Sequence, residues 1–188
     1  MACCRVQNQT GLTRFLETEE PADLGPRRRQ SVRSQKDLET ELDGLLQTSK
    51  LSPERDHAIR ALVLLWHDHL DAAHEIAQKL DTPDGAFVHG IMHRREPDFG
   101  NAAYWFRRVG RHPSFALISQ GVMALLKTEA SGTWSTRLIP NGEWDPFQFI
   151  SACEEAGQGN IAEAYLLRNV QRVEFEGFLG WLGARTAD

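Results

Sequence analysis

Apolar residues recur every three or four positions from Ser34 onward, which is the spacing of an amphipathic helix. A first helix is expected to begin after Ser34, a residue type that caps helix N-termini, and to end near Ser49. Ser52 and Pro53 signal a second helix, because Ser is a common N-cap and Pro fits the first helical position. The apolar stripe that follows predicts one long helix that continues to about Leu80.

Similar start and stop signals divide the rest of the chain into further helices. No segment alternates apolar and polar residues between turn signals, so the pattern does not predict a sheet. We therefore expect an all-α fold, a single compact domain of six or seven antiparallel-packed helices over residues 34–188. The later helices are expected over residues 83–96, 98–109, 114–126, 146–156 and 160–181, with an ordered loop over residues 131–143.

Residues 1–33 show no sustained period and end in a short basic run that begins at Arg27. Such a segment has too little apolar surface to offset the entropy lost on ordering it, so we expect a disordered, basic and polar tail. Within the basic run, Arg28 and Arg29 precede Ser31 in the form that a basophilic kinase accepts. Ser31 is therefore a candidate phosphorylation site.

The composition is that of an ordinary soluble globular domain. Of 188 residues, 41% are hydrophobic and 25% are charged, and the net charge is −5. This charge gives no electrostatic basis for binding nucleic acid. The longest apolar run, Ala61 to Trp66, is too short to cross a membrane. The cysteines form no disulfide framework or CxxC pair, which favours a reducing, cytoplasmic setting.

Residues 65–114 carry a rhythm of small, acidic and aromatic positions. An acidic residue precedes two alanines at Asp71, Phe87 and Gly90 follow on the next helix, and three aromatic residues begin at Tyr104. This stretch resembles the helical-hairpin repeats of the tetratricopeptide and Sel-like class over about one and a half units. The resemblance implies helices packed as antiparallel hairpins and a surface for binding, but no reaction.

Histidines are unusually concentrated in the same stretch, which holds five of the seven between His67 and His93. On the expected long helix, His67 and His74 lie seven residues apart on one flank of the apolar stripe, and His69 lies on the opposite flank. These side chains either line a cavity or remain solvated at the edge of the core.

A sharper pattern follows on the next helix, where His89, His93 and Glu96 occupy positions i, i+4 and i+7. This spacing places two imidazoles and a carboxylate on one helix face, as in helical metal sites. The hypothesis is a zinc or iron centre, with His67 and His74 as secondary candidates, in a metal-dependent hydrolase or non-haem iron oxygenase. Glu96 is one candidate for the carboxylate, and Glu174 of the last helix is the other.

A non-metal interpretation accounts for more residues. Arginine forks onto carboxylate or phosphate, and indole stacks on planar groups. Our leading hypothesis is therefore a non-catalytic helical binding domain for a small anionic ligand or an acidic peptide. The alternative is a salt-bridge network in which Glu96 and Asp98 neutralise the arginines. The ligand-binding candidates are Tyr104, Trp105, Arg107, Arg108 and His112, next to His89 and His93.

Overall fold

The expected capping residues start helices in the computed structural model, which describes residues 11–128, 132–157, 159 and 161–184. Each of these side chains accepts a hydrogen bond from a backbone N–H in the first turn, which satisfies a donor that the helix itself leaves unpaired. Pro follows the cap in three cases. The caps are Ser34, Ser52, Thr82, Asp98 and Asp145.

The described part of the chain forms nine α-helices and two 3₁₀ turns and contains no strand. This confirms the all-α class, whereas the expected count of six or seven helices is too low. None of these helices is both long enough and apolar enough to span a bilayer. The elements are η1 (Leu12–Leu16), α1 (Gln35–Leu46), α2 (Pro53–Trp66), α3 (Leu70–Ala77), α4 (Pro83–Arg95), α5 (Phe99–Val109), α6 (Ser114–Thr128), α7 (Gly132–Leu138), η2 (Pro140–Gly142), α8 (Pro146–Ala156) and α9 (Ile161–Gly183).

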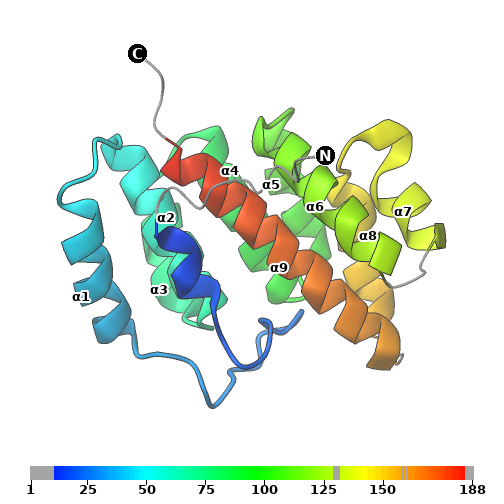
Figure 1. Cartoon of the computed structure of the whole chain (residues 1–188), viewed down its shortest axis with the longest axis horizontal. Helices are drawn as coiled ribbons and strands as arrows, with labels where there is room; N and C mark the ends of the chain where they lie inside the picture. Colours follow the sequence, from blue (N-terminus) through cyan, green and yellow to red (C-terminus); the bar gives the residue numbers. More distant parts are fainter. Residues whose placement is uncertain (1–10, 129–131, 158, 160, 185–188) are drawn as a thin grey trace, which may run out of the picture.

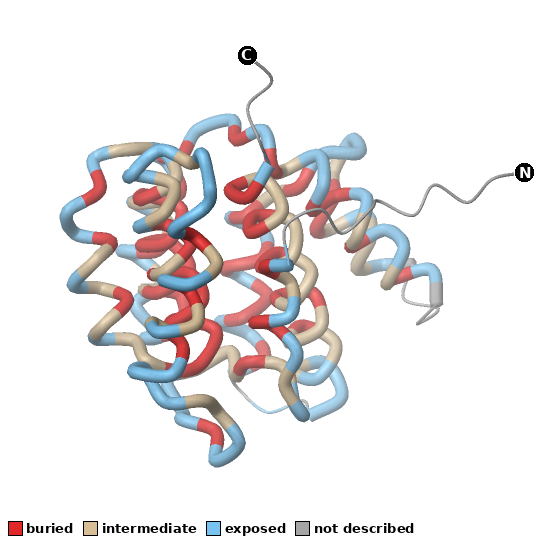
Figure 2. Tube along the Cα trace, turned by 60° about the vertical axis from the view of Figure 1, so that its left-hand side comes forward, coloured by how far each residue is buried: buried red, intermediate tan, exposed pale blue. Residues whose placement is uncertain are grey.

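The longest helix, α9, crosses the molecule diagonally, with α2 on one side and α6 on the other (Figure 1). Its Phe178 ring stacks on Phe87 of α4, with the ring centroids 4.1 Å apart. Gly121 and Gly177 allow α6 and α9 to approach closely, because a Cβ at either position would lie within 3 Å of the opposite helix. Figure 2 shows buried positions on the sides of the helices that face one another. Helix α4 is buried along most of its length.

The expected long helix over residues 53–80 is wrong, because it divides into α2 and α3. Asp68 lies between them with φ of 63°, a left-handed conformation that Asp tolerates better than most residues. Its carboxylate accepts hydrogen bonds from two buried arginines, Arg29 and Arg95. The break is therefore fixed by tertiary contacts that the helical period does not encode.

The expected loop over residues 131–143 also differs, since α7 and η2 lie within it. Leu138 and Ile139 are buried there and anchor this segment on the core. Residue 160, where the last helix is expected to begin, and residue 131, where the loop is expected to begin, lie outside the described residues.

Residues 11–33 are not a free tail. The 3₁₀ turn η1 packs on α9 and α2, and Leu12, Phe15 and Leu16 are almost completely buried. The burial of these three apolar side chains stabilises the ordered position of the segment. The expectation of a disordered tail, which was based on the lack of a helical period, did not include this burial. Residues 1–10 lie outside the described part. We refer to residues 11–33 as the N-terminal strap.

Candidate functional site

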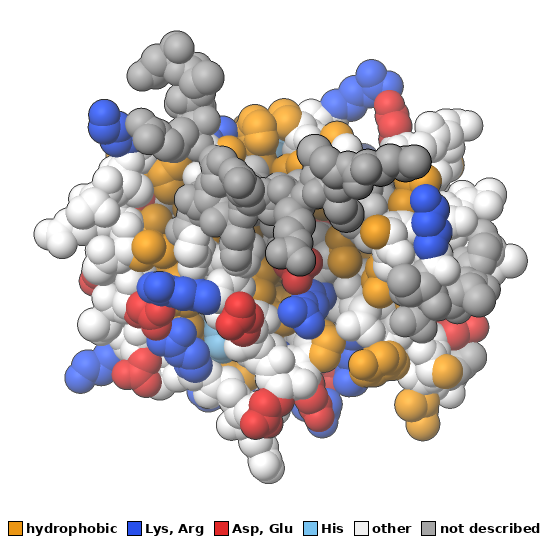
Figure 3. All heavy atoms as spheres, in the orientation of Figure 1, with side chains coloured by type: hydrophobic (Ala, Val, Ile, Leu, Met, Phe, Trp, Pro, Cys, Tyr) orange, Lys and Arg blue, Asp and Glu red, His pale blue; other side chains and the backbone are white. Residues whose placement is uncertain are grey.

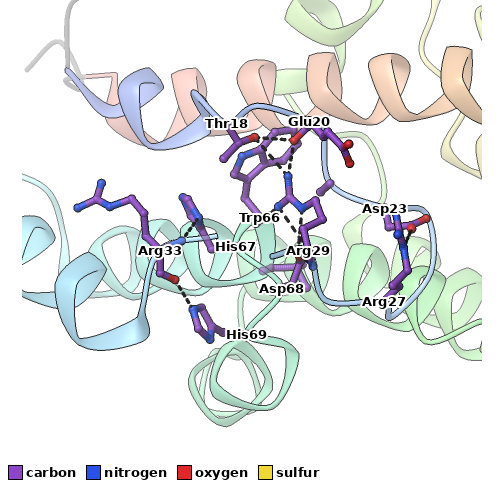
Figure 4. Close-up of polar contacts among 12 residues, drawn as sticks. Thr18, Glu20, Asp23, Arg27, Arg29, Arg33, Trp66, His67, Asp68 and His69 are labelled. Atoms are coloured by element: carbon purple, nitrogen blue, oxygen red, sulfur yellow. Dashed lines mark hydrogen bonds and ion pairs between the residues drawn. The ribbon is translucent and has the colours of Figure 1, made fainter. Parts of the chain in front are cut away.

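The candidate histidines and arginines of residues 65–114 separate into a buried group and an exposed group. The buried group holds the N-terminal strap on the helices and has Arg29 at its centre (Figure 4). Arg29 is 6% exposed and donates through Nε to Oδ2 of Asp68 at 2.9 Å. Its Nη atoms donate to the Trp66 carbonyl, the Glu20 carbonyl and the Thr18 hydroxyl. We call this set of contacts the clasp.

Arg95 completes the clasp from the last turn of α4. It is fully buried and donates to Asp68 Oδ1 at 2.7 Å and to the Asp23 carbonyl at 3.0 Å. Although burial pushes the pKa of the Asp68 carboxyl up, the bonds from Arg29 and Arg95 hold it below its ordinary value. The clasp thus pairs one buried carboxylate with two guanidinium groups, which also donate to backbone carbonyls and to the Thr18 hydroxyl.

His67 and His69 also belong to the strap contacts. Nε2 of His67 donates to the Phe15 carbonyl at 2.8 Å, and its Nδ1 accepts from Arg33 N–H at 3.4 Å. His69 Nε2 donates to the Arg33 carbonyl at 2.8 Å. Burial lowers the pKa of His67 to about 4, so its ring is neutral. Because the helix breaks at Asp68, His67 and His74 do not share a flank as expected.

Arg94 binds on the other side of α4. It is fully buried and donates to Glu174 Oε1 of α9 at 3.0 Å and to Gln171 Oε1 at 3.3 Å. Gln171 in turn donates to the Ala22 carbonyl of the strap at 3.0 Å. Glu174, an expected candidate for the metal carboxylate, therefore forms a buried ion pair with Arg94.

Three histidine rings lie together where α3 meets α4. The His74 centroid is 5.5 Å from that of His89 and 6.0 Å from that of His93, and His89 and His93 stack at 6.2 Å. His89 donates through Nδ1 to the Gly85 carbonyl at 3.2 Å and stacks on Trp105 of α5 at 4.0 Å. Burial lowers the pKa of His89 to about 4.

The expected metal set of His89, His93 and Glu96 stays a prediction. The His89 and His93 rings are stacked with their centroids 6.2 Å apart, and zinc would require one nitrogen of each ring at about 2.0–2.1 Å from the ion. A carboxylate oxygen of Glu96 lies 3.2 Å from His93 Nδ1. Within the described ranges no group of three or more His, Cys, Asp and Glu residues is arranged to hold a metal ion.

The exposed group lies on the outer side of α5. Tyr104, Arg107 and Arg108 follow at i, i+3 and i+4, and all three are exposed, Tyr104 by 48%. Arg108 pairs with Asp81 at 3.0 Å, where the two side chains are 46% and 96% exposed, and its guanidinium lies 5.4 Å from the Trp105 ring centroid. We call Tyr104, Arg107 and Arg108 the α5 face.

Trp105 and His112 do not join the α5 face as expected. Trp105 is half-buried, and at least one side of its ring is covered by His89. His112 is buried between Asp84 and Ser114, with Nε2 2.8 Å from Asp84 Oδ1 and Nδ1 2.7 Å from Ser114 Oγ. Asp84, His112 and Ser114 are the residue types of a nucleophilic triad, but Ser114 is completely buried, so solvent does not reach its hydroxyl.

Two acidic partners were missed by sequence reasoning, Asp81 for Arg108 and Asp84 for His112. Both flank the Thr82 cap, where acidic residues are expected for helix reasons alone. Ser31 is exposed, but Arg29 of its kinase-like sequence is buried in the clasp, so the basic run is not fully accessible to an enzyme.

Charge on the surface is mixed rather than segregated. On the view drawn in Figure 3, basic and acidic side chains lie next to one another at several places. On this face no single sign of charge dominates. In comparisons with protein-family models, curated proteins and solved structures, nothing matches this chain.

Proposed function

We propose that this chain is a helical binding domain whose α5 face takes an anionic ligand, with an acidic peptide as the best-fitting class. The observation that carries the proposal is the state of Arg107 and Arg108. Arg107 is exposed, and Arg108 forms its ion pair with Asp81, whose side chain is 96% exposed. Exposed ion pairs contribute about 0–1 kcal/mol, so an incoming carboxylate replaces Asp81 at little cost.

The shape of the α5 face favours a peptide over a small molecule. Small-molecule sites are concave and enclose most of their ligand. The two arginines project from an exposed helix surface, and Tyr104 next to them offers a ring for stacking. An extended acidic segment can contact both guanidinium groups at once. A compact anion, in contrast, would not be enclosed by this open surface.

The resemblance to tetratricopeptide-type repeats over residues 65–114 remains part of this proposal. It is supported by the close approach of α4 and α5 at Gly90, where a Cβ would lie 2.6 Å from the Phe106 ring. A cytoplasmic location likewise remains an expectation. It is in keeping with Cys153, a free buried thiol whose pKa burial raises to about 12.

The test is binding of a fluorescein-labelled peptide of alternating Glu and Gly residues, measured by anisotropy at low and high salt. The Arg107→Glu and Arg108→Glu double variant should weaken binding about tenfold or more, because it removes two charge pairs and adds repulsion. The matched control is Lys36→Glu with Lys127→Glu, which changes net charge equally at exposed sites elsewhere.

Binding should also weaken as salt rises, since the contacts are solvent-exposed. An equal loss in the control pair would show that only net charge matters and would overturn the site. Absence of binding by the wild-type chain at millimolar peptide would overturn the function.

A further inference from the structure

A separate pocket lies at the beginning of α6, beyond the end of α5. It has a volume of about 260 Å³ and is enclosed by three segments that are distant in sequence. These are the turn between α5 and α6, the first two turns of α6, and the stretch from η2 to α8. The lining residues that matter below are Arg111, Phe115, Ser119, Glu143 and Trp144.

Two hydrogen-bonding side chains of this pocket lack a partner within the described structure. Ser119 is 5% exposed and Trp144 is 3% exposed, and neither Ser119 Oγ nor Trp144 Nε1 makes a hydrogen bond. Leaving a buried polar group unsatisfied costs about 1–3 kcal/mol. His112 also lines the pocket, but both of its ring nitrogens are already engaged, by Asp84 and Ser114. The unpaired hydrogen-bonding groups of this lining therefore belong to Ser119 and Trp144 rather than to His112.

The walls of the pocket are flat and apolar. Phe115, Pro113 and the Trp144 ring provide them, and Ala116 leaves room at the helix surface. Pockets for drug-sized ligands have volumes of about 300–1,000 Å³. At about 260 Å³ this pocket suits a smaller group, of the size of one aromatic side chain.

Charge at the mouth differs from charge in the interior. The Arg111 side chain is 95% exposed and lies 3.9 Å from the Glu143 carboxylate, which is 74% exposed. Arg111 is thus a weakly paired cation at the rim, and Glu143 beside it repels a second anionic group. The rim favours a ligand with one carboxylate.

We propose that this pocket binds a hydroxyaryl monocarboxylate, that is, a phenol ring joined by a short linker to a single carboxylate. The ring lies between Phe115 and Trp144, the phenol oxygen accepts from Trp144 Nε1–H and pairs with Ser119, and the carboxylate binds Arg111. A free phenolic acid and the C-terminal tyrosine of a peptide share this chemistry. The proposal does not depend on the α5 face, which uses other arginines.

The test uses the ¹⁵N-labelled full chain and follows the indole N–H signals of its five tryptophans by NMR. The probe is 3-(4-hydroxyphenyl)propanoate, and a Trp144→Phe variant serves to assign the Trp144 signal. We expect the probe to move the Trp144 signal in a saturable way. Trp66 and Trp181 also have unpartnered Nε1 atoms but do not line the pocket, so their signals are internal controls.

Two variants with a matched probe test the roles of the polar groups. 3-Phenylpropanoate lacks the phenol oxygen and should bind about tenfold more weakly to the wild-type chain, given the cost of an unsatisfied donor. Ser119→Ala should reduce this preference, and Arg111→Gln should weaken both probes. Arg107→Gln, which changes an arginine of the α5 face, should weaken neither.

The two ligand sources are separated by a tetrapeptide that ends in tyrosine, compared as free acid and as amide. Tighter binding of the free-acid peptide than of the phenolic acid assigns the pocket to peptide C-termini, and the reverse assigns it to small phenolic acids. A Trp144 signal unmoved by either ligand at millimolar concentration overturns the proposal. So does an unchanged preference for the phenol oxygen in a folded Ser119→Ala protein. The Arg107→Glu and Arg108→Glu double variant keeps this binding, so failure here is distinguishable from failure of the α5 face.

Discussion

Two arginine pairs with nearly identical sequence settings have opposite fates in this molecule. Arg94 and Arg95 end α4, and Arg107 and Arg108 lie in the last turn of α5. The first pair is completely buried and binds Glu174 and Asp68, whereas the second pair is exposed on the α5 face. A buried guanidinium needs a carboxylate partner because its desolvation is expensive, whereas a solvated guanidinium remains accessible to a ligand.

The helix that carries each pair explains the difference. α5 is amphipathic, with Ala102, Phe106 and Val109 turned inward and polar residues outside. α4 is buried on nearly every side from Gly85 to Arg95, because α2, α3 and α5 all pack around it. A helix enclosed in this way buries the arginines at its end together with its apolar residues. The lesson is that an arginine pair is a surface candidate only when its helix has a solvated face.

The largest expected effect is on the buried pair. Arg95→Met should lower the free energy of unfolding by about 3–5 kcal/mol, because it leaves the Asp68 carboxylate buried with one guanidinium fewer. Arg107→Met should change it by less than about 0.5 kcal/mol, since it alters an exposed surface position. Urea unfolding followed by circular dichroism measures both. Equal effects of the two substitutions would show that burial does not distinguish the pairs.

Lowering the pH should also lower the free energy of unfolding, through His67 at the N-terminal strap. His67 has a folded-state pKa of about 4, below its unfolded value of about 6.5, so the unfolded chain takes up a proton first as the pH falls. The stabilisation is complete above about pH 6.5 and is lost between pH 6.5 and 4, by about 2–3 kcal/mol. His89 adds a contribution of the same sign.

The titration is measured directly from the histidine ring signals in NMR, alongside unfolding at each pH. A midpoint for His67 near 6.5 in the folded protein would contradict the sealed contact with Phe15. His57, which is exposed on α2, gives a further ring signal, and a His57→Gln variant identifies it.

Helix packing gives a smaller effect that bears on how α4 is enclosed. A Cβ on Gly90 would lie 2.6 Å from two ring carbons of Phe106 on α5, so Gly90→Ala should destabilise the fold by about 1–2 kcal/mol through overpacking. The control is Gly44→Ala on α1, where nothing lies within 4 Å. There the better helix propensity of alanine should stabilise the protein by up to about 1 kcal/mol. Thermal or urea unfolding of the two variants should therefore shift in opposite directions.

Local signals made the helix starts predictable, and contacts between distant segments made other features unpredictable. Ser52 and Asp145 cap helices because their side chains bond backbone groups two or three residues away. The break at Asp68 depends on Arg29, 39 residues earlier in the chain, and no local period reveals such a partner. Nor does a helical period detect η1, which is too short to repeat.

The candidate site was predicted in part for the same reason. The i, i+4 rule brought His89 and His93 to one helix face, as the stacked rings show, but the orientation of each ring depends on its surroundings. Trp105 supplies the ring against which His89 lies, and Glu174 was already paired with Arg94. Spacing therefore predicted which residues come together, and tertiary packing decided which of them remain available.

The smallest expected effect concerns the ion pair between Arg108 and Asp81 on the unbound α5 face. A double-mutant cycle with Arg108→Met and Asp81→Asn should give a coupling free energy between zero and about 1 kcal/mol, decreasing with salt. Urea unfolding of the four proteins at low and high salt measures it. A coupling of several kcal/mol would mean that Asp81 holds Arg108 as firmly as Asp68 holds Arg95. In that case Arg108 is a structural residue, and an acidic ligand would have to displace a costly contact. A weak coupling instead means that a carboxylate of the ligand can replace Asp81 beside Arg108 at little cost in free energy.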